Sequence, residues 1–475
     1  MFRRIAFLLL VPFSLSAGLT ARVAAQDTRT VIEPLLPPTC ATLDARLQTA
    51  RHTLAPADES KLDTVRIQKA IDRCGKGRAV RLHVDEANNA FLTGPLKLKP
   101  EVALIVDRGV TLFASRDPAL FAVSPGSCGI VSHAPGSPPS QGQTPVGAGP
   151  GSRGCKPLIS VDHAPGSAVM GDGVIDGRGG EKMLGSEYSW WDLAEQARAG
   201  GNQQVPRLIV ADFSDNFTLY RITLKNSSNF HVVYDHGDGF TVWGLRIDTP
   251  QRLARNTDGV DTGNGAKNIT ITHSYIRTGD DNVAIKGGPG GVTNMTVSHN
   301  HFYWGHGMSI GSETNGGVSK IRVFDLSLDG PDNGIRIKSN GSRGGVTEDV
   351  VYDDVCIRNS PNPITFDSGY TAAGTLQGNS PPSMRDVILK NIRISGGGKF
   401  TFNGYAKDYR VAATLDGVQI TDEAKYAYDL RHADLTLGAG PTNLHFPTGE
   451  DSSVKGTPAE GNPASCSDKF VPFPE

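Results

Sequence analysis

The segment Asn216-Phe217-Thr218-Leu219 alternates polar with apolar residues, and its pattern recurs six more times along the chain. The copies begin 23, 29, 26, 26, 29 and 37 residues apart, and each leads into a second short apolar piece without an intervening helical pattern. They are Gly239-Phe240-Thr241-Val242, Asn268-Ile269-Thr270-Ile271, Asn294-Met295-Thr296-Val297, Lys320-Ile321-Arg322-Val323, Asp349-Val350-Val351-Tyr352 and Asp386-Val387-Ile388-Leu389. A repeat of this length made of short β-pieces predicts an all-β chain that winds into a parallel β-helix, a solenoid of stacked coils.

Other repeat architectures fit this pattern less well. A leucine-rich repeat has a similar period but requires a ladder of leucines that the copies lack, and a propeller blade requires ~40 residues. The recurrent Asn at the start of several copies suits either stacked side-chain amides at coil corners or an ordinary preference for turns. Before the repeats, Ile67, Ala70, Ile71 and Cys74 follow Asp63 at helical spacing, which predicts one short capping helix at the N-terminal end.

The chain begins with a pattern typical of a secretory signal peptide. Arg3 and Arg4 precede the apolar run 5–13, and small residues follow up to Ala25. We therefore expect residues 1–25 to be removed and the protein to be secreted, either to the extracellular space or to the periplasm. No later stretch approaches ~18 consecutive apolar residues, so we expect no membrane anchor. Residues 26–475 carry 44 basic and 49 acidic residues, a net charge of −5, which argues against a nucleic-acid partner.

We expect residues 26–475 to form a single domain and to act as a monomer. Residues 134–154 are rich in Pro, Gly, Ser and Gln and predict a surface excursion; a linker between two domains is the alternative, but the same strand pattern continues on both sides. Six cysteines in an exported chain favour disulfides, and the absence of a C-x-x-C pair gives no support to zinc or thiol redox chemistry. Their order suggests the pairs Cys40–Cys74, Cys128–Cys155 and Cys356–Cys466.

Four short polar motifs lie on consecutive copies of the repeat. They are Asn256-Thr257-Asp258-Gly259-Val260-Asp261, Gly279-Asp280-Asp281-Asn282, Gly305-His306-Gly307 and Gly334-Ile335-Arg336-Ile337-Lys338. Asp280 follows Asp258 by 22 residues, His306 follows Asp281 by 25, and Arg336 follows His306 by 30. Because each gap is close to one coil and parallel strands lie ~4.8 Å apart, we expect these side chains to stack on one face. Arg336 and Lys338 alternate with inward isoleucines and should point outward together.

Such a cluster predicts unusual electrostatics. Several carboxylates within a few ångströms repel one another, so at least one should keep its proton to an unusually high pH. A protonated carboxyl beside an ionised one supplies the acid and the base that cleavage of a glycosidic bond requires. Neighbouring Arg and Lys side chains suit a sugar that carries a carboxylate.

Each motif taken singly is more typical of a turn or a solvated strand face, and the functional interpretation depends on their joint occurrence. A calcium site formed by Asp258, Asp261, Asp280 and Asp281 is an alternative, since oxygen clusters suit Ca²⁺. It does not explain why His306, Arg336 and Lys338 accompany the carboxylates.

In this order, the four motifs resemble the signatures of the polygalacturonases, family 28 of the glycoside hydrolases. The resemblance extends over nearly all of residues 26–475. It implies a right-handed parallel β-helix that hydrolyses the α-1,4 bonds of galacturonan in pectin with inversion, without a cofactor or a metal.

The resemblance also implies a role for each site residue. Asp280 resembles the general acid, Asp258 and Asp281 resemble the pair that activates water, and His306 would keep the acid correctly protonated. The substrate-binding residues would be Arg336 and Lys338, which hold a galacturonate carboxylate, together with Tyr370 and Asn256. Carboxylates on adjacent coils lie closer than the ~6.5–9.5 Å expected of inverting enzymes, so the implied inversion requires several carboxylates to share one water.

Residues 305–314 and the segment Asn229-Phe230-His231-Val232-Val233 are similar to endo-acting bacterial enzymes of the soft-rot type, so we expect endo action. Exo-acting polygalacturonases keep the same motifs, and the excursion 134–154 or the tail that carries Cys466 could narrow the substrate site and favour that mode. Rhamnogalacturonan hydrolases share the fold but not the full set of motifs. A Ca²⁺-dependent pectate lyase and a non-catalytic solenoid adhesin are further alternatives; a lyase would release products that absorb in the ultraviolet.

Overall fold

The computed structural model describes residues 26–50, 53–132, 154–199, 201–370, 379–462 and 464–475. The predicted signal peptide, residues 1–25, and residues 134–153 of the predicted excursion lie outside these ranges. None of the helices in the described part of the chain is long and apolar enough to cross a membrane.

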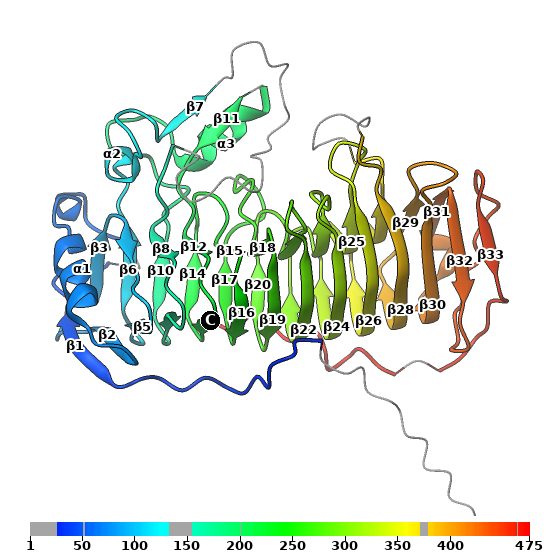
Figure 1. Cartoon of the computed structure of the whole chain (residues 1–475), viewed down its shortest axis with the longest axis horizontal. Helices are drawn as coiled ribbons and strands as arrows, with labels where there is room; N and C mark the ends of the chain where they lie inside the picture. The colour runs from blue at the N-terminus through cyan, green and yellow to red at the C-terminus, as the bar shows by residue number, and fades with distance from the viewer. Residues whose placement is uncertain (1–25, 51–52, 133–153, 200, 371–378, 463) are drawn as a thin grey trace, which may run out of the picture.

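The described residues form an elongated stack of coils with two long parallel sheets (Figure 1). The eleven-stranded sheet contains β4 (Leu96–Lys97), β8 (Ile159–Asp162), β12 (Ile209–Asp212), β15 (Val232–Asp235), β18 (Val260–Gly263), β21 (Val283–Lys286), β23 (Met308–Gly311), β25 (Asn333–Lys338), β27 (Asn362–Asp367), β29 (Gly398–Asn403) and β31 (Tyr426–Arg431). The predicted parallel β-helix is thereby confirmed, and its coils wind in the right-handed sense that parallel crossovers favour.

The other long sheet joins twenty strands along the remaining sides of the coils. They are β1 (Thr39–Asp44), β2 (Arg78–His83), β3 (Ala90–Thr93), β5 (Val102–Val106), β6 (Thr111–Ala114), β9 (Ala168–Met170), β10 (Val174–Asp176), β13 (Phe217–Tyr220), β14 (Thr223–Lys225), β16 (Asp238–Trp243), β17 (Arg246–Asp248), β19 (Ala266–Thr272), β20 (Tyr275–Arg277), β22 (Val292–Phe302), β24 (Val318–Asp329), β26 (Val346–Arg358), β28 (Ser383–Ser395), β30 (Val411–Ile420), β32 (Ala433–Leu437) and β33 (Ser453–Lys455).

The strand register confirms the repeat predicted from the sequence. Phe217 pairs with Phe240, Phe240 with Ile269, Ile269 with Met295, and the same column continues through Ile321, Val350 and Val387. The residue before each of these has a positive φ, which is 55° at Asn216, 100° at Gly239 and 54° at Asn268. Asn, Asp and Gly tolerate this left-handed backbone best, so corner geometry explains why Asn recurs there. Amide stacking contributes one weak contact, in which Asn294 Nδ2 donates to Asn268 Oδ1 at 3.4 Å.

One continuous hydrophobic core fills the coils from Ala45 to Leu444. The predicted helix is α1 (Thr64–Arg73), and it buries Ile67 and Ile71 in this core at the N-terminal end of the stack (Figure 1). All three predicted disulfides are present: Cys40–Cys74, Cys128–Cys155 and Cys356–Cys466. The ordered stacking of buried apolar residues leaves the outward positions of each strand free for function.

Short elements project from the coils beside the eleven-stranded sheet. They are α2 (Pro118–Phe121), α3 (Trp190–Gln196) and an antiparallel pair formed by β7 (Ile130–Ser132) and β11 (Asn202–Gln204), which together form a raised lobe (Figure 1). The remaining short helices are η1 (Pro56–Asp58), η2 (Ala197–Ala199) and η3 (Glu423–Lys425). The lobe reaches the predicted site through β11, as the contact of Asn256 described below shows.

Both ends of the described chain run back along the outside of the coils (Figure 1). At the N-terminal end, the backbone N–H groups of Gln26 and Asp27 donate to Thr296 Oγ1 of β22. At the C-terminal end, Cys466 is bonded to Cys356 of β26, and Lys469 forms an ion pair with Asp354 at 3.1 Å. The two terminal segments are thus attached to coils near the middle of the stack, far from them in the sequence.

Candidate active site

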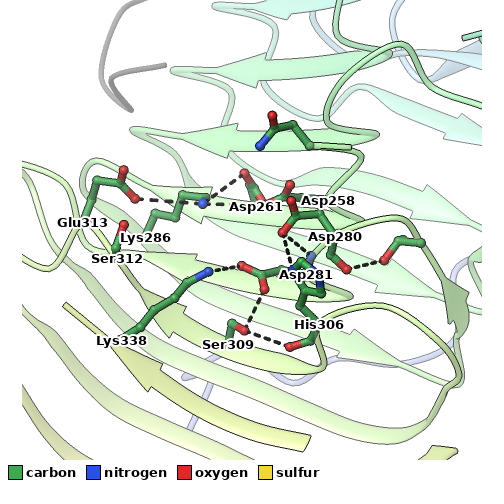
Figure 2. Close-up of polar contacts among 12 residues, drawn as sticks. Asp258, Asp261, Asp280, Asp281, Lys286, His306, Ser309, Ser312, Glu313 and Lys338 are labelled. Carbon is green, nitrogen blue, oxygen red and sulfur yellow. Dashed lines mark hydrogen bonds and ion pairs between the residues drawn. The ribbon is translucent and has the colours of Figure 1, made fainter. Parts of the chain in front are cut away.

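The strand register brings the predicted site residues together on the outer face of the eleven-stranded sheet. Val260 pairs with Val283, which pairs with Met308, so Asp258, Asp281 and His306, each two residues before one of these, lie on adjacent coils. Arg336 pairs with Ser309 and shares a column with Asp261. Figure 2 shows Asp258, Asp261, Asp281 and His306 converging on one space above the strands.

Asp281 is fully buried and is bound by two cations. Arg336 Nη2 donates to Asp281 Oδ1, Lys338 Nζ donates to Oδ2 at 2.9 Å, and Ser309 Oγ donates to Oδ1 at 2.9 Å. Burial alone would raise the pKa of Asp281, but Arg336 and Lys338 outweigh it and hold the pKa at about 2. This carboxylate is therefore ionised at any pH at which the protein would act.

Arg336 and Lys338 point outward from the sheet as predicted, because Ile335 and Ile337 fill the core with no exposed surface. They are nevertheless only 7% and 5% exposed, which is a different environment from the solvated strand face that alternation alone suggests. In the free protein their direct partner is Asp281.

Asp280 and His306 form a second ionic pair beside Asp281. His306 Nδ1 lies 2.9 Å from Asp280 Oδ1, and the His306 backbone N–H donates to the Asp280 carbonyl at 2.8 Å. Burial raises the pKa of Asp280, but His306, Lys338 and Arg336 together lower it by more than burial raises it. The pKa of Asp280 therefore lies well below its usual range. Burial lowers the pKa of His306, and Asp280 raises it to about 9. At neutral pH the pair holds one proton, and that proton rests on the imidazole.

A third group consists of Asp258, Asp261 and Lys286. Lys286 Nζ lies 3.6 Å from Asp258 Oδ2 and 3.9 Å from Asp261 Oδ2. Burial and the neighbouring carboxylates raise the pKa of Asp258 well above its usual value; burial raises that of Asp261 to about 7 although Lys286 opposes it. The sequence predicted that a clustered carboxylate would retain its proton, and Asp258 and Asp261 are the ones that do.

Sequence reasoning missed Lys286, Ser309 and Glu313 as members of the site. Lys286 carried a readable signal, because the strand 283–286 repeats the apolar-x-apolar-Lys pattern of the strand 335–338. Glu313 Oε2 lies 3.9 Å from Lys286 Nζ (Figure 2). Its other oxygen accepts a hydrogen bond from Arg343 Nη1. Glu313 lies on an irregular segment after β23, where no periodic pattern identifies its direction.

The two remaining predicted residues lie at the edges of the cluster. Tyr370 is half-buried, and its ring centroid lies 5.2 Å from Lys338 Nζ. Asn256 is also half-buried, and its Oδ1 accepts a hydrogen bond from Gln203 Nε2 of β11 at 3.2 Å. Tyr370 is thus placed to border a ligand bound at Lys338, whereas the carbonyl of Asn256 contacts the raised lobe.

Asp280, Asp281 and His306 each offer one ligand atom within 4.8 Å of the others, as a metal site would. Arg336, Lys338 and Ser309 already engage both oxygens of Asp281. Two adjacent cationic side chains also repel a divalent ion. The donor set therefore favours proton chemistry over metal binding.

Comparisons with known proteins agree with this geometry. A family model described as glycosyl hydrolases family 28 matches residues 141–432. An endo-polygalacturonase of Pectobacterium carotovorum subsp. carotovorum is 40% identical, over 87% of this chain and 95% of its own length. A polygalacturonase of Ralstonia nicotianae is 37% identical over 93% of this chain and 92% of its own length. The solved polygalacturonase from Erwinia carotovora ssp. carotovora superposes with a TM-score of 0.76, at 38% identity over 86% of this chain and 99% of that chain.

The matched family model spans more than half of the chain and contains every predicted site residue. The Pectobacterium and Ralstonia relatives extend the likeness over most of the rest. The solved structure shares the stacked coils that hold these residues in register. The chain therefore belongs to family 28 of the glycosyl hydrolases.

Proposed function

We propose that the protein hydrolyses the α-1,4 bonds between galacturonate residues of polygalacturonate and that it acts within the chain rather than at its end. The observation that carries this proposal is the division of protonation states within one cluster. Asp281 is ionised, Asp280 shares a proton with His306, and Asp258 retains its own. Neighbouring carboxyl groups driven to opposite protonation states are what acid–base cleavage of a glycosidic bond requires. The endo mode is supported by the 40% identical endo-polygalacturonase of Pectobacterium.

Asp280 and His306 together act as the general acid. In the free protein the proton rests on His306, whose Nδ1 lies 2.9 Å from Asp280 Oδ1. A sugar bound over Asp280 excludes water, which raises the affinity of the carboxylate for this proton. The proton then passes through Asp280 to the oxygen of the leaving sugar.

Asp258 and Asp281 act on the attacking water. Asp258 takes the proton of the water in the molecules in which it has first released its own proton to solvent, and its raised pKa makes that ionised form the stronger base. Asp281 stays ionised and stabilises the positive charge that develops on the sugar ring. Both of its oxygens are bound by Arg336, Lys338 and Ser309, which leaves it poorly suited to attack the sugar directly. This favours attack by water and therefore inversion.

The substrate carboxylate binds where the cationic side chains gather. Lys286, Arg336 and Lys338 lie together on the outer face of the sheet, in a chain whose residues 26–475 carry a net charge of −5. Charge-assisted bonds from such groups favour carboxylates, and a ring that approaches Lys338 also meets Tyr370. An acidic sugar is therefore preferred over a neutral one.

We also propose that residues 26–475 form one exported domain. The hydrophobic core is continuous from Ala45 to Leu444, and three disulfides are typical of an oxidising compartment. A monomeric state stays a prediction that light scattering tests.

The test is a time course of products on unesterified polygalacturonate with wild type and Asp280→Asn. We expect an early mixture of oligomers with a fast fall in viscosity, and a loss of rate of about 10²–10⁴-fold in the variant. Release of monomer or dimer alone would reject the endo mode, and products with an ultraviolet-absorbing double bond would reject hydrolysis. Full activity in Asp280→Asn would reject its role as the acid.

A further inference from the structure

His306 lies between two carboxylates rather than beside one. Its Nδ1 faces Asp280 at 2.9 Å, and its Nε2 lies 3.4 Å from Asp332 Oδ2. The exposed fraction of the side chains rises along this row, from 17% at Asp280 through 31% at His306 to 50% at Asp332. Asp332 thus forms the outer, more solvent-exposed end of the row that leads to Asp280.

The position of Asp332 is set by contacts that do not involve His306. Gln251 Nε2 donates to Asp332 Oδ1 at 3.2 Å, and the Asp332 backbone N–H donates to the Gly305 carbonyl at 2.7 Å. Asn362 Nδ2 of the following coil donates to the Asp332 carbonyl at 3.0 Å. Residues from three other coil segments therefore hold this carboxylate in place, with its second oxygen left for the imidazole.

The charge on His306 depends on groups that favour the neutral ring and groups that favour the imidazolium, and Asp332 favours the imidazolium. The charged groups that face the imidazole are Asp280, Asp332 and Arg336. Burial and Arg336 favour the neutral ring, whereas the two aspartates favour the imidazolium. The same contact lowers the pKa of Asp332 through its hydrogen bond with His306. Both partners are therefore charged in the free protein.

We propose that Asp332 is a positioning residue for the reaction: it keeps His306 charged and turned so that Nδ1–H faces Asp280. This inference rests on the proposed function, because it concerns the proton that Asp280 delivers. An uncharged His306 would free its Nδ1 lone pair to face Asp280, and the pair would then lack the proton to give. Asp332 therefore sets the highest pH at which His306 still carries the proton that Asp280 delivers.

The test replaces Asp332 by Asn, which keeps the shape and the contacts of the backbone. We expect the alkaline limb of the kcat profile to move to lower pH by about half a unit to one unit, with KM unchanged and with wild-type activity near pH 5. Asp332→Glu should return the alkaline limb of the kcat profile to its wild-type pH. Asp329→Asn, which removes an aspartate three residues earlier that pairs with Arg358 at 2.5 Å, is the matched control and should leave the limb in place.

A measurement without substrate separates this inference from the proposed function. The titration of the His306 imidazole, followed by nitrogen NMR in the free protein, should shift to lower pH in Asp332→Asn. An unshifted titration, or an equal loss of kcat at every pH, would overturn the role of Asp332. A shifted titration in a protein that does not hydrolyse polygalacturonate would instead overturn the proposed function and leave the Asp332–His306 coupling in place.

Discussion

Replacing Asp261 by Asn should make the stability of the protein less dependent on pH. Asp261 lies on β18 with 3% of its surface exposed, and neither of its oxygens has a hydrogen-bond partner among the described residues. Burial raises its pKa from 3.8 to about 7, against the opposing effect of Lys286. A carboxyl group that binds its proton more tightly in the folded than in the unfolded chain favours folding only while it is protonated.

The size of the effect follows from the shift. About three pKa units correspond to roughly 4 kcal/mol at 1.36 kcal/mol per unit. This contribution is fully present below about pH 4, is lost as the pH rises to about 7, and does not change further above that. Asn does not titrate, so the variant should lack this decline. The Asp261 carboxylate also raises the pKa of Asp258, so the variant removes this like charge as well.

The assay is urea unfolding at intervals from pH 4 to pH 8, with the disulfides intact. The free energy of unfolding of wild type should fall by about 4 kcal/mol more than that of Asp261→Asn over this range. Asp386→Asn is the control, because Asp386 is exposed at a coil corner with φ of 50°, a conformation that Asn also adopts. Parallel curves for wild type and Asp261→Asn would refute the reasoning and place the Asp261 carboxyl in a more solvated environment.

Three further predictions concern the substrate, metals and the C-terminal segment. Lys338→Met should lower the preference for polygalacturonate over methyl-esterified pectin, and an unchanged preference would show that Lys338 does not bind the substrate carboxylate. The same variant should destabilise the protein by up to about 3–5 kcal/mol, because Asp281 then keeps a single cationic side chain as its direct partner. Activity should survive EDTA, because side chains fill every proposed role; a loss that Ca²⁺ restores would favour a lyase. Cys466→Ser opens a link across 110 residues and should lower the free energy of unfolding by about 2–4 kcal/mol with little loss of activity at 25 °C; unchanged stability would show that the C-terminal segment binds without the disulfide.

Much of the fold was predictable because a parallel β-helix converts sequence period into spatial register. The same positive-φ corner recurs in each coil, so Asn216 and Asn268 mark the frame in which Phe217, Phe240 and Ile269 pair. Residues one coil apart in the sequence then become neighbours, and for this reason the spacing of Asp258, Asp281 and His306 in the sequence is enough to place them together. Lys286 could have been found in the same way.

The protonation states could not be predicted to the same extent. The sequence indicates which face Arg336 and Lys338 occupy, but their burial depends on segments from other coils and on how deeply Asp281 lies between them. The resemblance assigns Asp280 as the acid, which suggests a carboxyl that holds its own proton. In the structure its pKa is lowered, because His306 lies 2.9 Å away. The distance between the side chains of Asp280 and His306 decides how far the pKa of Asp280 is lowered. The spacing of the two residues in the sequence does not give that distance.

The arrangement of charges along the coils gives the site a direction. Four carboxylates, Asp258, Asp261, Asp280 and Asp281, face four cationic side chains, Lys286, His306, Arg336 and Lys338. The two carboxyl groups near β18 face a single lysine, Lys286, whereas β25 contributes two cations, Arg336 and Lys338, on the C-terminal side of the cluster. On the proposed function, a galacturonate carboxylate is therefore drawn to β25, and the bond to be cleaved lies over Asp280 and Asp281, one or two coils away. Reversing the charge of Lys338 should for this reason raise KM for polygalacturonate, and it should also lower kcat because Lys338 contacts Asp281 and lowers its pKa; an unchanged KM would contradict this direction.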